Sequence, residues 1–269
     1  MRTALALLSL TPLTISSCGS NDEAVELRFS ALVGSEPFRC GTTYADLGAG
    51  TELTPVDLRF YVHDVRLLRE DGSEVRVELD DDGKWQNGEV VLLDFEDGCG
   101  DMGNADLNDR VLGVAPAGPY TGIRFKVGVP EHLNHADASL AGAPLNLTSL
   151  FWNWNAGYKF LRVDGRSGSF EQWRLHLGST GCTGDMAGDA RCTTSNIVDV
   201  SLEGFDPTEQ PVVADLARLV EGSTLANTGE SPPGCMSGPM DPDCAPLFEN
   251  LGLPFGEMPA GTQRFFRVP

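Results

Sequence analysis

Four histidines are the side chains of this sequence best suited to binding a metal. His63 lies in an apolar stretch, His132 and His135 share one short polar segment, and His176 lies in an alternating run. Imidazole nitrogens with few thiolates or carboxylates beside them suit copper or zinc. A single histidine is more often a surface or hydrogen-bonded residue, and no two of these four form a short metal-binding motif. A site therefore requires that the fold bring them together.

A tryptophan pair is the second chemical feature, since Trp152 and Trp154 are two of the four tryptophans in the chain. In an extended strand, residues two apart point the same way, so both indoles are expected on one face and the asparagines at 153 and 155 on the other. The pattern alone favours a pair of core aromatic residues followed by a bulge at Gly157.

Several classes of function are disfavoured by the sequence. It lacks a nucleophile elbow, a P-loop, a dinucleotide-binding fingerprint and an H-E-x-x-H motif, and no serine, histidine or carboxylate has the spacing of a catalytic group. The formal net charge of −20 argues against nucleic acid or an anionic membrane surface as a partner. We therefore expect a binding protein that is not an enzyme.

Residues 1–17 have the features of a lipoprotein signal peptide. Arg2 is followed by a short apolar run, and Ile15-Ser16-Ser17 stands directly before Cys18. This arrangement resembles a bacterial lipobox, in which cleavage leaves a diacylated cysteine. The alternative is an ordinary secretory signal followed by an incidental cysteine. The lipobox interpretation predicts an exported periplasmic or outer-membrane lipoprotein, with residues 18–23 as a lipidated linker and membrane contact through the anchor only.

The remaining six cysteines are expected to form three disulfides, because an exported chain folds in an oxidising compartment. They are Cys40, Cys99, Cys182, Cys192, Cys235 and Cys244. Many connectivities are possible, but the short loops favour pairing Cys182 with Cys192 and Cys235 with Cys244, leaving Cys40 for Cys99. Soft-metal ligation competes weakly with this interpretation, because no C-x-x-C spacing occurs.

Alternating apolar residues predict a mostly β chain. Strands are expected near residues 25–33, 56–67, 75–79, 90–95, 123–129, 170–177, 197–202 and 264–268. The apolar parity changes within the second of these, which predicts a bulge near His63 and Asp64. On the strand at 170–177, the alternation places His176 on the face opposite Trp173.

One helix is expected at 211–220, where apolar residues recur at three- and four-residue intervals. The C-terminal segment is rich in glycine, proline and serine around Cys235 and Cys244. The fold class predicted is all-β: one domain over residues 24–269, built as an antiparallel β-sandwich or a partly closed barrel, with one short helix and a disulfide-pinned tail.

Several ordered blocks of the sequence resemble the MbnP-like family, and more narrowly its metallo-mystery pair branch with a four-Cys motif. The blocks are Phe38-Arg39-Cys40-Gly41, residues 60–67, Gly128-Val129-Pro130 with Asn134-His135, residues 151–162, residues 176–182, Pro233-Gly234-Cys235-Met236-Ser237 and Asp241-Pro242-Asp243-Cys244. They cover nearly all of the chain after the signal peptide.

The resemblance implies periplasmic copper handling together with a diheme enzyme of the cytochrome c peroxidase type. That partner is expected to oxidise the first tryptophan of W-x-W, Trp152, to kynurenine. Ring opening frees an aryl amine and a ketone, whereas an intact indole N–H only donates. The resemblance implies a copper site, with Cu(I), that contains His176 and His135 ahead of His63, with His132 a weaker candidate. The alternative is a disulfide-stapled surface module for interaction or adhesion, without a metal.

Overall fold

The larger of two stacked sheets is built on the long strand β4 (Thr51–Leu68). The computed structural model describes residues 21–100, 103–168, 170–184, 189–226 and 234–269. The larger sheet has the order β16-β9-β4-β12-β13-β18, and β3, β5 and β7 also pair with β4. Its other strands are β16 (Val198–Glu203), β9 (Gly122–Val127), β12 (Leu161–Ser167), β13 (Phe170–Leu177), β18 (Gly234–Cys235), β3 (Tyr44–Leu47), β5 (Glu74–Arg76) and β7 (Val90–Asp94).

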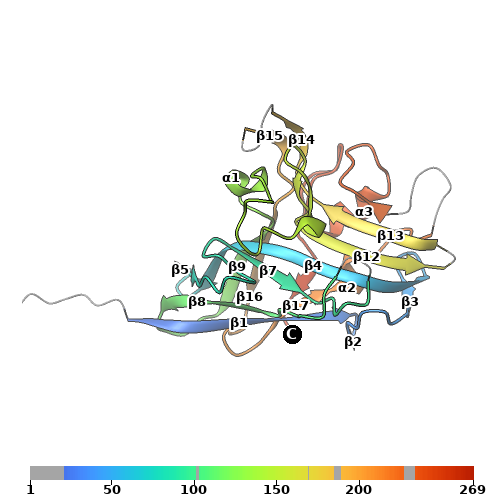
Figure 1. Cartoon of the computed structure of the whole chain (residues 1–269). Coiled ribbons are helices and arrows are strands. Elements are labelled where there is room, and N and C mark those ends of the chain that lie inside the picture. Colours follow the sequence, from blue (N-terminus) through green and yellow to red (C-terminus); the bar gives the residue numbers. More distant parts are fainter. Residues whose placement is uncertain (1–20, 101–102, 169, 185–188, 227–233) are drawn as a thin grey trace, which may run out of the picture.

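The second sheet lies below the first in Figure 1 and has the order β19-β17-β1-β8-β6, with β2 beside β1. These strands are β19 (Phe266–Arg267), β17 (Val212–Asp215), β1 (Asp22–Val33), β8 (Arg110–Pro116), β6 (Glu78–Leu79) and β2 (Glu36–Pro37). Two small hairpins join β10 (Phe151–Asn153) to β11 (Gly157–Tyr158), and β14 (Thr180–Thr183) to β15 (Arg191–Thr194). The predicted all-β sandwich is confirmed.

Phenylalanine side chains fill the space between the two sheets. Phe60 of β4 and Phe125 of β9 extend from the larger sheet, and Phe29 of β1 and Phe266 of β19 extend from the smaller. The ring centroids of Phe29 and Phe125 are 5.5 Å apart, and those of Phe60 and Phe266 are 5.3 Å apart, all edge-on. Such pairs stabilise beyond the apolar area that they bury. This core covers one face of β4, so only the opposite face is left to pack against other segments of the chain.

The other face of β4 is covered by the connection from β9 to β12. The Tyr61 hydroxyl donates to the carbonyl of Pro144 over 3.1 Å, and its ring meets Tyr158 with centroids 5.9 Å apart. β4 also contains the predicted bulge: its register with β9 shifts between His63 and Arg66, and Asp64 has a φ of +49°. The outer face of the sheet is therefore buried even though it carries polar side chains. Burial of polar groups is costly unless each has a hydrogen-bond partner or an opposite charge.

The predicted helix over 211–220 is wrong in its first half. Val212–Asp215 form β17, which pairs in parallel with β1, and only Leu216–Leu219 are helical (α2). β-Branched side chains at 212 and 213 favour the strand, and the Asp215 side chain accepts from the Ala217 N–H over 3.2 Å to begin the helix. The other described helices are α1 (Glu131–Asn134), the 3₁₀ turn η1 (Thr148–Leu150) and α3 (Cys244–Asn250).

The three disulfides join Cys40 to Cys99, Cys182 to Cys192, and Cys235 to Cys244, which is the pairing predicted from the loop lengths. The last of these ties β18 to α3 and so pins the C-terminal segment. The signal peptide predicted over residues 1–17, and Cys18, lie outside the described residues. None of the helices in the described ranges is long and apolar enough to cross a bilayer.

Candidate metal centre

The two tryptophans of the W-x-W motif do not share a strand face, contrary to the sequence-based prediction. Trp152 lies in β10, whereas Trp154 lies in the turn to β11. The Asn153 side chain accepts hydrogen bonds from the N–H groups of Asn155 and Ala156, over 3.0 and 2.9 Å, and this closes the turn. The hairpin therefore gives the two indoles different surroundings.

Trp152 is packed beside His176, one of the four histidines. The centroids of their rings are 6.4 Å apart, with the planes tilted by 54°. Gly178 allows this approach, because a Cβ there would collide with the indole ring of Trp152. Lys159 lies over the indole, with its Nζ 6.0 Å from the ring centroid. Burial lowers the pKa of Lys159 to about 8.

One ring nitrogen of His176 is hydrogen-bonded to a carboxylate, and the other has no hydrogen-bond partner among the described residues. Its Nε2 lies 2.6 Å from Oδ1 of Asp164, so this nitrogen donates to the carboxylate. Its Nδ1 is buried and has no hydrogen-bond partner among the described residues. A carboxylate that fixes one imidazole nitrogen and orients the other is the usual support of a metal-binding histidine. His176 Nδ1 therefore fits a metal ligand.

The electrostatics keep this imidazole neutral and its carboxylate ionised. Burial lowers the pKa of His176, and the hydrogen bond to Asp164 offsets only part of that effect. Burial raises the pKa of Asp164, but the hydrogen bond from His176 and the charge of Arg162 outweigh this and lower the pKa to about 2. A neutral imidazole with a free nitrogen lone pair is the form that binds metals.

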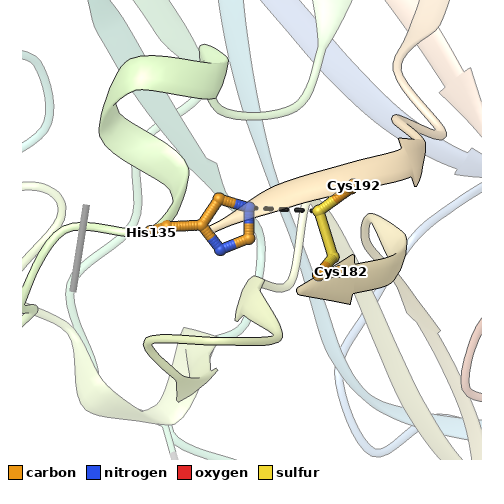
Figure 2. Close-up of side chains that lie close together, drawn as sticks. All are labelled: His135, Cys182 and Cys192. Carbon is orange, nitrogen blue, oxygen red and sulfur yellow. Dashed lines mark hydrogen bonds between the residues drawn. A yellow bond between two sulfur atoms is a disulfide. The ribbon is translucent and has the colours of Figure 1, made fainter. Parts of the chain in front are cut away.

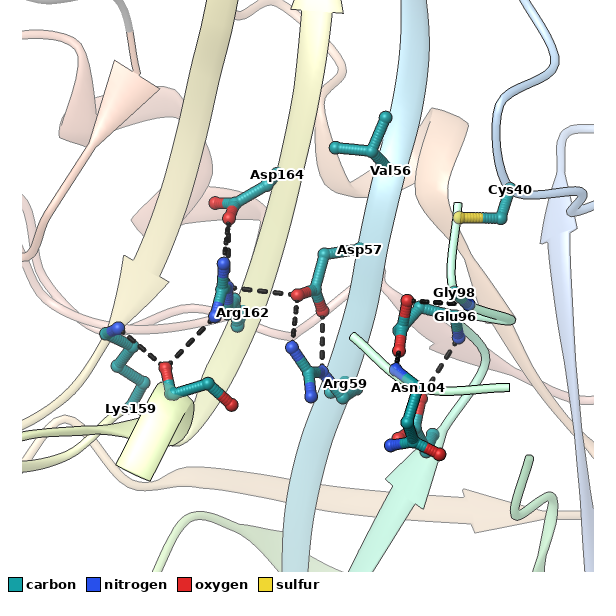
Figure 3. A network of polar contacts seen from close by, with 12 residues as sticks. Cys40, Val56, Asp57, Arg59, Glu96, Gly98, Asn104, Lys159, Arg162 and Asp164 are labelled. Atoms are coloured by element: carbon teal, nitrogen blue, oxygen red, sulfur yellow. Dashed lines mark hydrogen bonds and ion pairs between the residues drawn. The ribbon is translucent and has the colours of Figure 1, made fainter. Parts of the chain in front are cut away.

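A buried ionic network supports this pair on the outer face of the larger sheet (Figure 3). Arg162 contacts Asp57 at 3.0 Å and Asp164 at 2.5 Å, and Arg59 donates to Asp57 from Nε over 2.9 Å. The register explains the alternation of charge: Arg162 lies opposite both Arg59 and His176, and Asp164 lies opposite Asp57. Each of these buried charges thus has a partner of opposite sign, two residues away on its own strand, and the Arg162–Asp57 contact joins β12 to β4.

Met236 is a candidate ligand that the sequence analysis did not single out. Its side chain is 49% exposed, and it lines an open pocket of about 500 Å³ together with Trp152. Ser237 fixes its position, because Ser237 Oγ donates to the His176 carbonyl and accepts from the Gly178 N–H, each over 3.0 Å. A thioether is a soft donor that suits Cu(I). The only sequence signal was its place beside Cys235.

The other three histidines each have hydrogen-bond partners of their own. His63, at the bulge, lies with Nδ1 2.9 Å from the carbonyl oxygen of Gly128. The exposed His132 contacts Glu89 at 2.9 Å. His135 contacts the Trp154 carbonyl oxygen and the sulfur of Cys192. Of the sequence-predicted site residues, the structure brings together Trp152 and His176.

The fold and these contacts define the class: a disulfide-bonded β-sandwich in which one indole lies beside a buried imidazole and shares a pocket with a thioether. The family model MbnP matches residues 22–237, so the chain belongs to the MbnP family. This membership relates it to methanobactin-related, copper-associated exported proteins.

A solved structure titled MbnP from Methylosinus trichosporium is similar over almost the whole fold. It is 29% identical, with a TM-score of 0.83, and the similarity covers 92% of this chain and 98% of that one. No curated protein gives a significant match.

Proposed function

We propose that this protein binds copper as Cu(I), with His176 Nδ1 and the Met236 thioether as ligands beside Trp152. The observation that carries this proposal is the buried and unpartnered Nδ1 of an imidazole whose other nitrogen is fixed by Asp164. Cu(I) accepts low coordination by nitrogen and thioether donors, so one of each forms a plausible core. The protein acts as a binding partner for copper and not as an enzyme.

Oxidation of Trp152 to kynurenine completes the site. A partner of the diheme cytochrome c peroxidase type removes four electrons and four protons from the indole and passes them to peroxide, which is reduced to water. Water supplies the oxygen atoms, the C2–C3 bond of the five-membered ring breaks, and C2 leaves as formate. The side chain thereby gains an aryl amine and a ketone in place of a group that only donates. Trp152 is half-buried and lines the open pocket, so the partner can reach its edge from solvent. The partner and the lipid anchor on Cys18 belong to this proposal.

Co-expression with the diheme enzyme tests the modification. We expect the intact mass to shift by the difference between tryptophan and kynurenine, and peptide mapping to place the change at Trp152. The Trp152→Phe variant is expected to keep its mass and to bind copper weakly, while Trp154→Phe remains convertible. Tight copper binding by protein with an intact Trp152 would contradict the need for oxidation.

Met236→Leu tests the thioether ligand. Leucine keeps the size and apolar character but has no sulfur lone pair, so we expect the Cu(I) affinity to fall by at least about tenfold, or ~1.4 kcal/mol. Competition with a chromophoric Cu(I) chelator measures the change. Met240→Leu is the matched control, because Met240 is 90% exposed and does not line this pocket. Equal affinities in the two variants would remove Met236 from the site.

A further inference from the structure

A smaller cavity adjoins the proposed copper pocket and is lined by a different set of side chains. Its volume is about 170 Å³, and it lies where the hairpin β14–β15, the turn before β16, the loop after β18 and a C-terminal turn meet. The two cavities share Thr180, Ser237 and Pro239. Neither Trp152 nor Met236 is among the described residues that line the smaller one. It is therefore distinct from the cavity that holds the proposed copper ligands.

Asn196 supplies a buried hydrogen-bond acceptor at this cavity. It is 4% exposed and lines the cavity, and its Oδ1 has no hydrogen-bond partner among the described residues. Its Nδ2 donates to the Gly178 carbonyl over 2.7 Å, which fixes the orientation of the amide. Its φ of +52° lies in the left-handed region, which asparagine adopts more readily than most residues. A buried acceptor without a partner costs free energy, so this oxygen points to a ligand that donates a hydrogen bond.

Two threonine hydroxyls also line the cavity. Thr180 of β14 and Thr194 of β15 lie directly opposite each other, and the Cys182–Cys192 disulfide joins the same two strands (Figure 2). Each hydroxyl can both donate and accept a hydrogen bond. None of the nine described residues that line the cavity is charged. The lining therefore suits a neutral ligand that carries several hydroxyl groups.

The rest of the lining consists mainly of apolar rings. Phe248 of α3 and Phe255 meet edge-on, with ring centroids 5.2 Å apart, and Pro239 and Pro254 line the cavity beside them. A disulfide ties α3 to β18, and Phe255 exchanges two backbone hydrogen bonds with Met258, over 3.0 and 2.9 Å. The cavity thus combines polar groups with apolar rings that the fold holds in place.

We propose that this cavity binds one pyranose ring of a neutral sugar. A pyranose has hydroxyl groups around its edge and a face of C–H groups, which match the polar groups and the apolar rings of this lining. One sugar hydroxyl donates to Asn196 Oδ1, and the C–H face packs against Phe255. The cavity is smaller than the clefts of about 300–1,000 Å³ that hold drug-sized ligands, so it fits a single ring. This site goes beyond the proposed copper function, because it needs neither a metal nor an oxidised Trp152.

Titration of the full-length protein with methyl glycosides, in the presence of a copper chelator, tests the site. Methyl α-D-glucopyranoside, methyl α-D-galactopyranoside and methyl α-D-mannopyranoside are the probes, and saturation-transfer difference NMR is the measurement. We expect saturable binding of at least one, with the strongest transfer to C–H protons on one face of its ring. Trp152→Phe and Met236→Leu should bind it as tightly as the wild type, because neither side chain lines the cavity. If none of the three binds saturably, water alone fills the cavity and the proposal is overturned.

Two variants place the sugar in this cavity. Thr194→Val removes one lining hydroxyl and keeps the shape of an exposed side chain, so we expect binding to weaken by at least about threefold. Thr193→Val is the matched control, because Thr193 is exposed on the same strand and does not line the cavity. Asn196→Gly suits the positive φ but removes the buried acceptor, and we expect a loss of at least about tenfold. Wild-type affinity in both Thr194→Val and Asn196→Gly would place the sugar elsewhere and overturn the proposal.

Discussion

His176→Ala is expected to lower the Cu(I) affinity of the protein co-expressed with its oxidising partner by at least about a hundredfold, or ~2.8 kcal/mol. The substitution removes the nitrogen that the fold holds buried and without a hydrogen-bond partner beside Trp152. It also removes the imidazole that Asp164 orients, and alanine has no lone pair with which to replace it. Competition with a chromophoric Cu(I) chelator measures the loss.

Two further variants separate the loss of a ligand from loss of the fold. His176→Gln retains an amide donor for Asp164 but offers no imidazole nitrogen, and we expect it to lose copper as His176→Ala does. His132→Ala removes an exposed histidine that contacts Glu89 and should bind copper like the wild type. Far-UV circular dichroism checks that all three are folded. Wild-type affinity in folded His176→Ala would exclude His176 as a ligand.

Strand periodicity predicted the sandwich and half of the site. The parity change in β4 predicted the bulge next to His63, and the alternation of β13 placed His176 opposite Trp173. Both depend only on neighbouring residues, since side chains alternate along a strand whatever its partners are. The same argument could not predict that Asp164 meets His176, because that contact depends on the register between β12 and β13.

Side-chain hydrogen bonds and pairing between distant strands explain where the sequence-based predictions were wrong or incomplete. Strict alternation put Trp152 and Trp154 on one face, but the Asn153 side chain bonds two N–H groups ahead of it and turns the chain. Likewise, the spacing at 211–220 suits a helix, yet Val212 and Val213 pair with β1. Met236 follows no period, and only the pairing of β18 with β13 brings its segment beside His176.

The buried charges of the outer sheet face give the largest expected effect on stability. Arg162→Leu should lower the free energy of unfolding by about 3–5 kcal/mol, because it leaves the buried Asp164 carboxylate without a cation and removes one of the two arginines that contact Asp57. Arg162 is 6% exposed and contacts both Asp57 and Asp164, and it also donates to the Ser149 carbonyl over 3.0 Å. Leucine fills much of the volume but satisfies none of these acceptors. Guanidinium chloride unfolding at neutral pH measures the change.

The pH dependence distinguishes this electrostatic cause from a packing defect. The pKa of Asp164 is lowered from 3.8 to about 2 in the folded protein, so its ionised form stabilises the fold above pH 3.8, and this contribution is lost as the pH falls toward 2. The difference in free energy of unfolding between wild type and Arg162→Leu should therefore become smaller as the pH falls from 3.8 toward 2. Arg110→Leu is the control: its contacts with Glu26 and Asp109 are exposed, so it should cost at most about 1 kcal/mol. A gap that stays constant with pH would assign the cost to packing, because Asp164 would then titrate alike in both proteins.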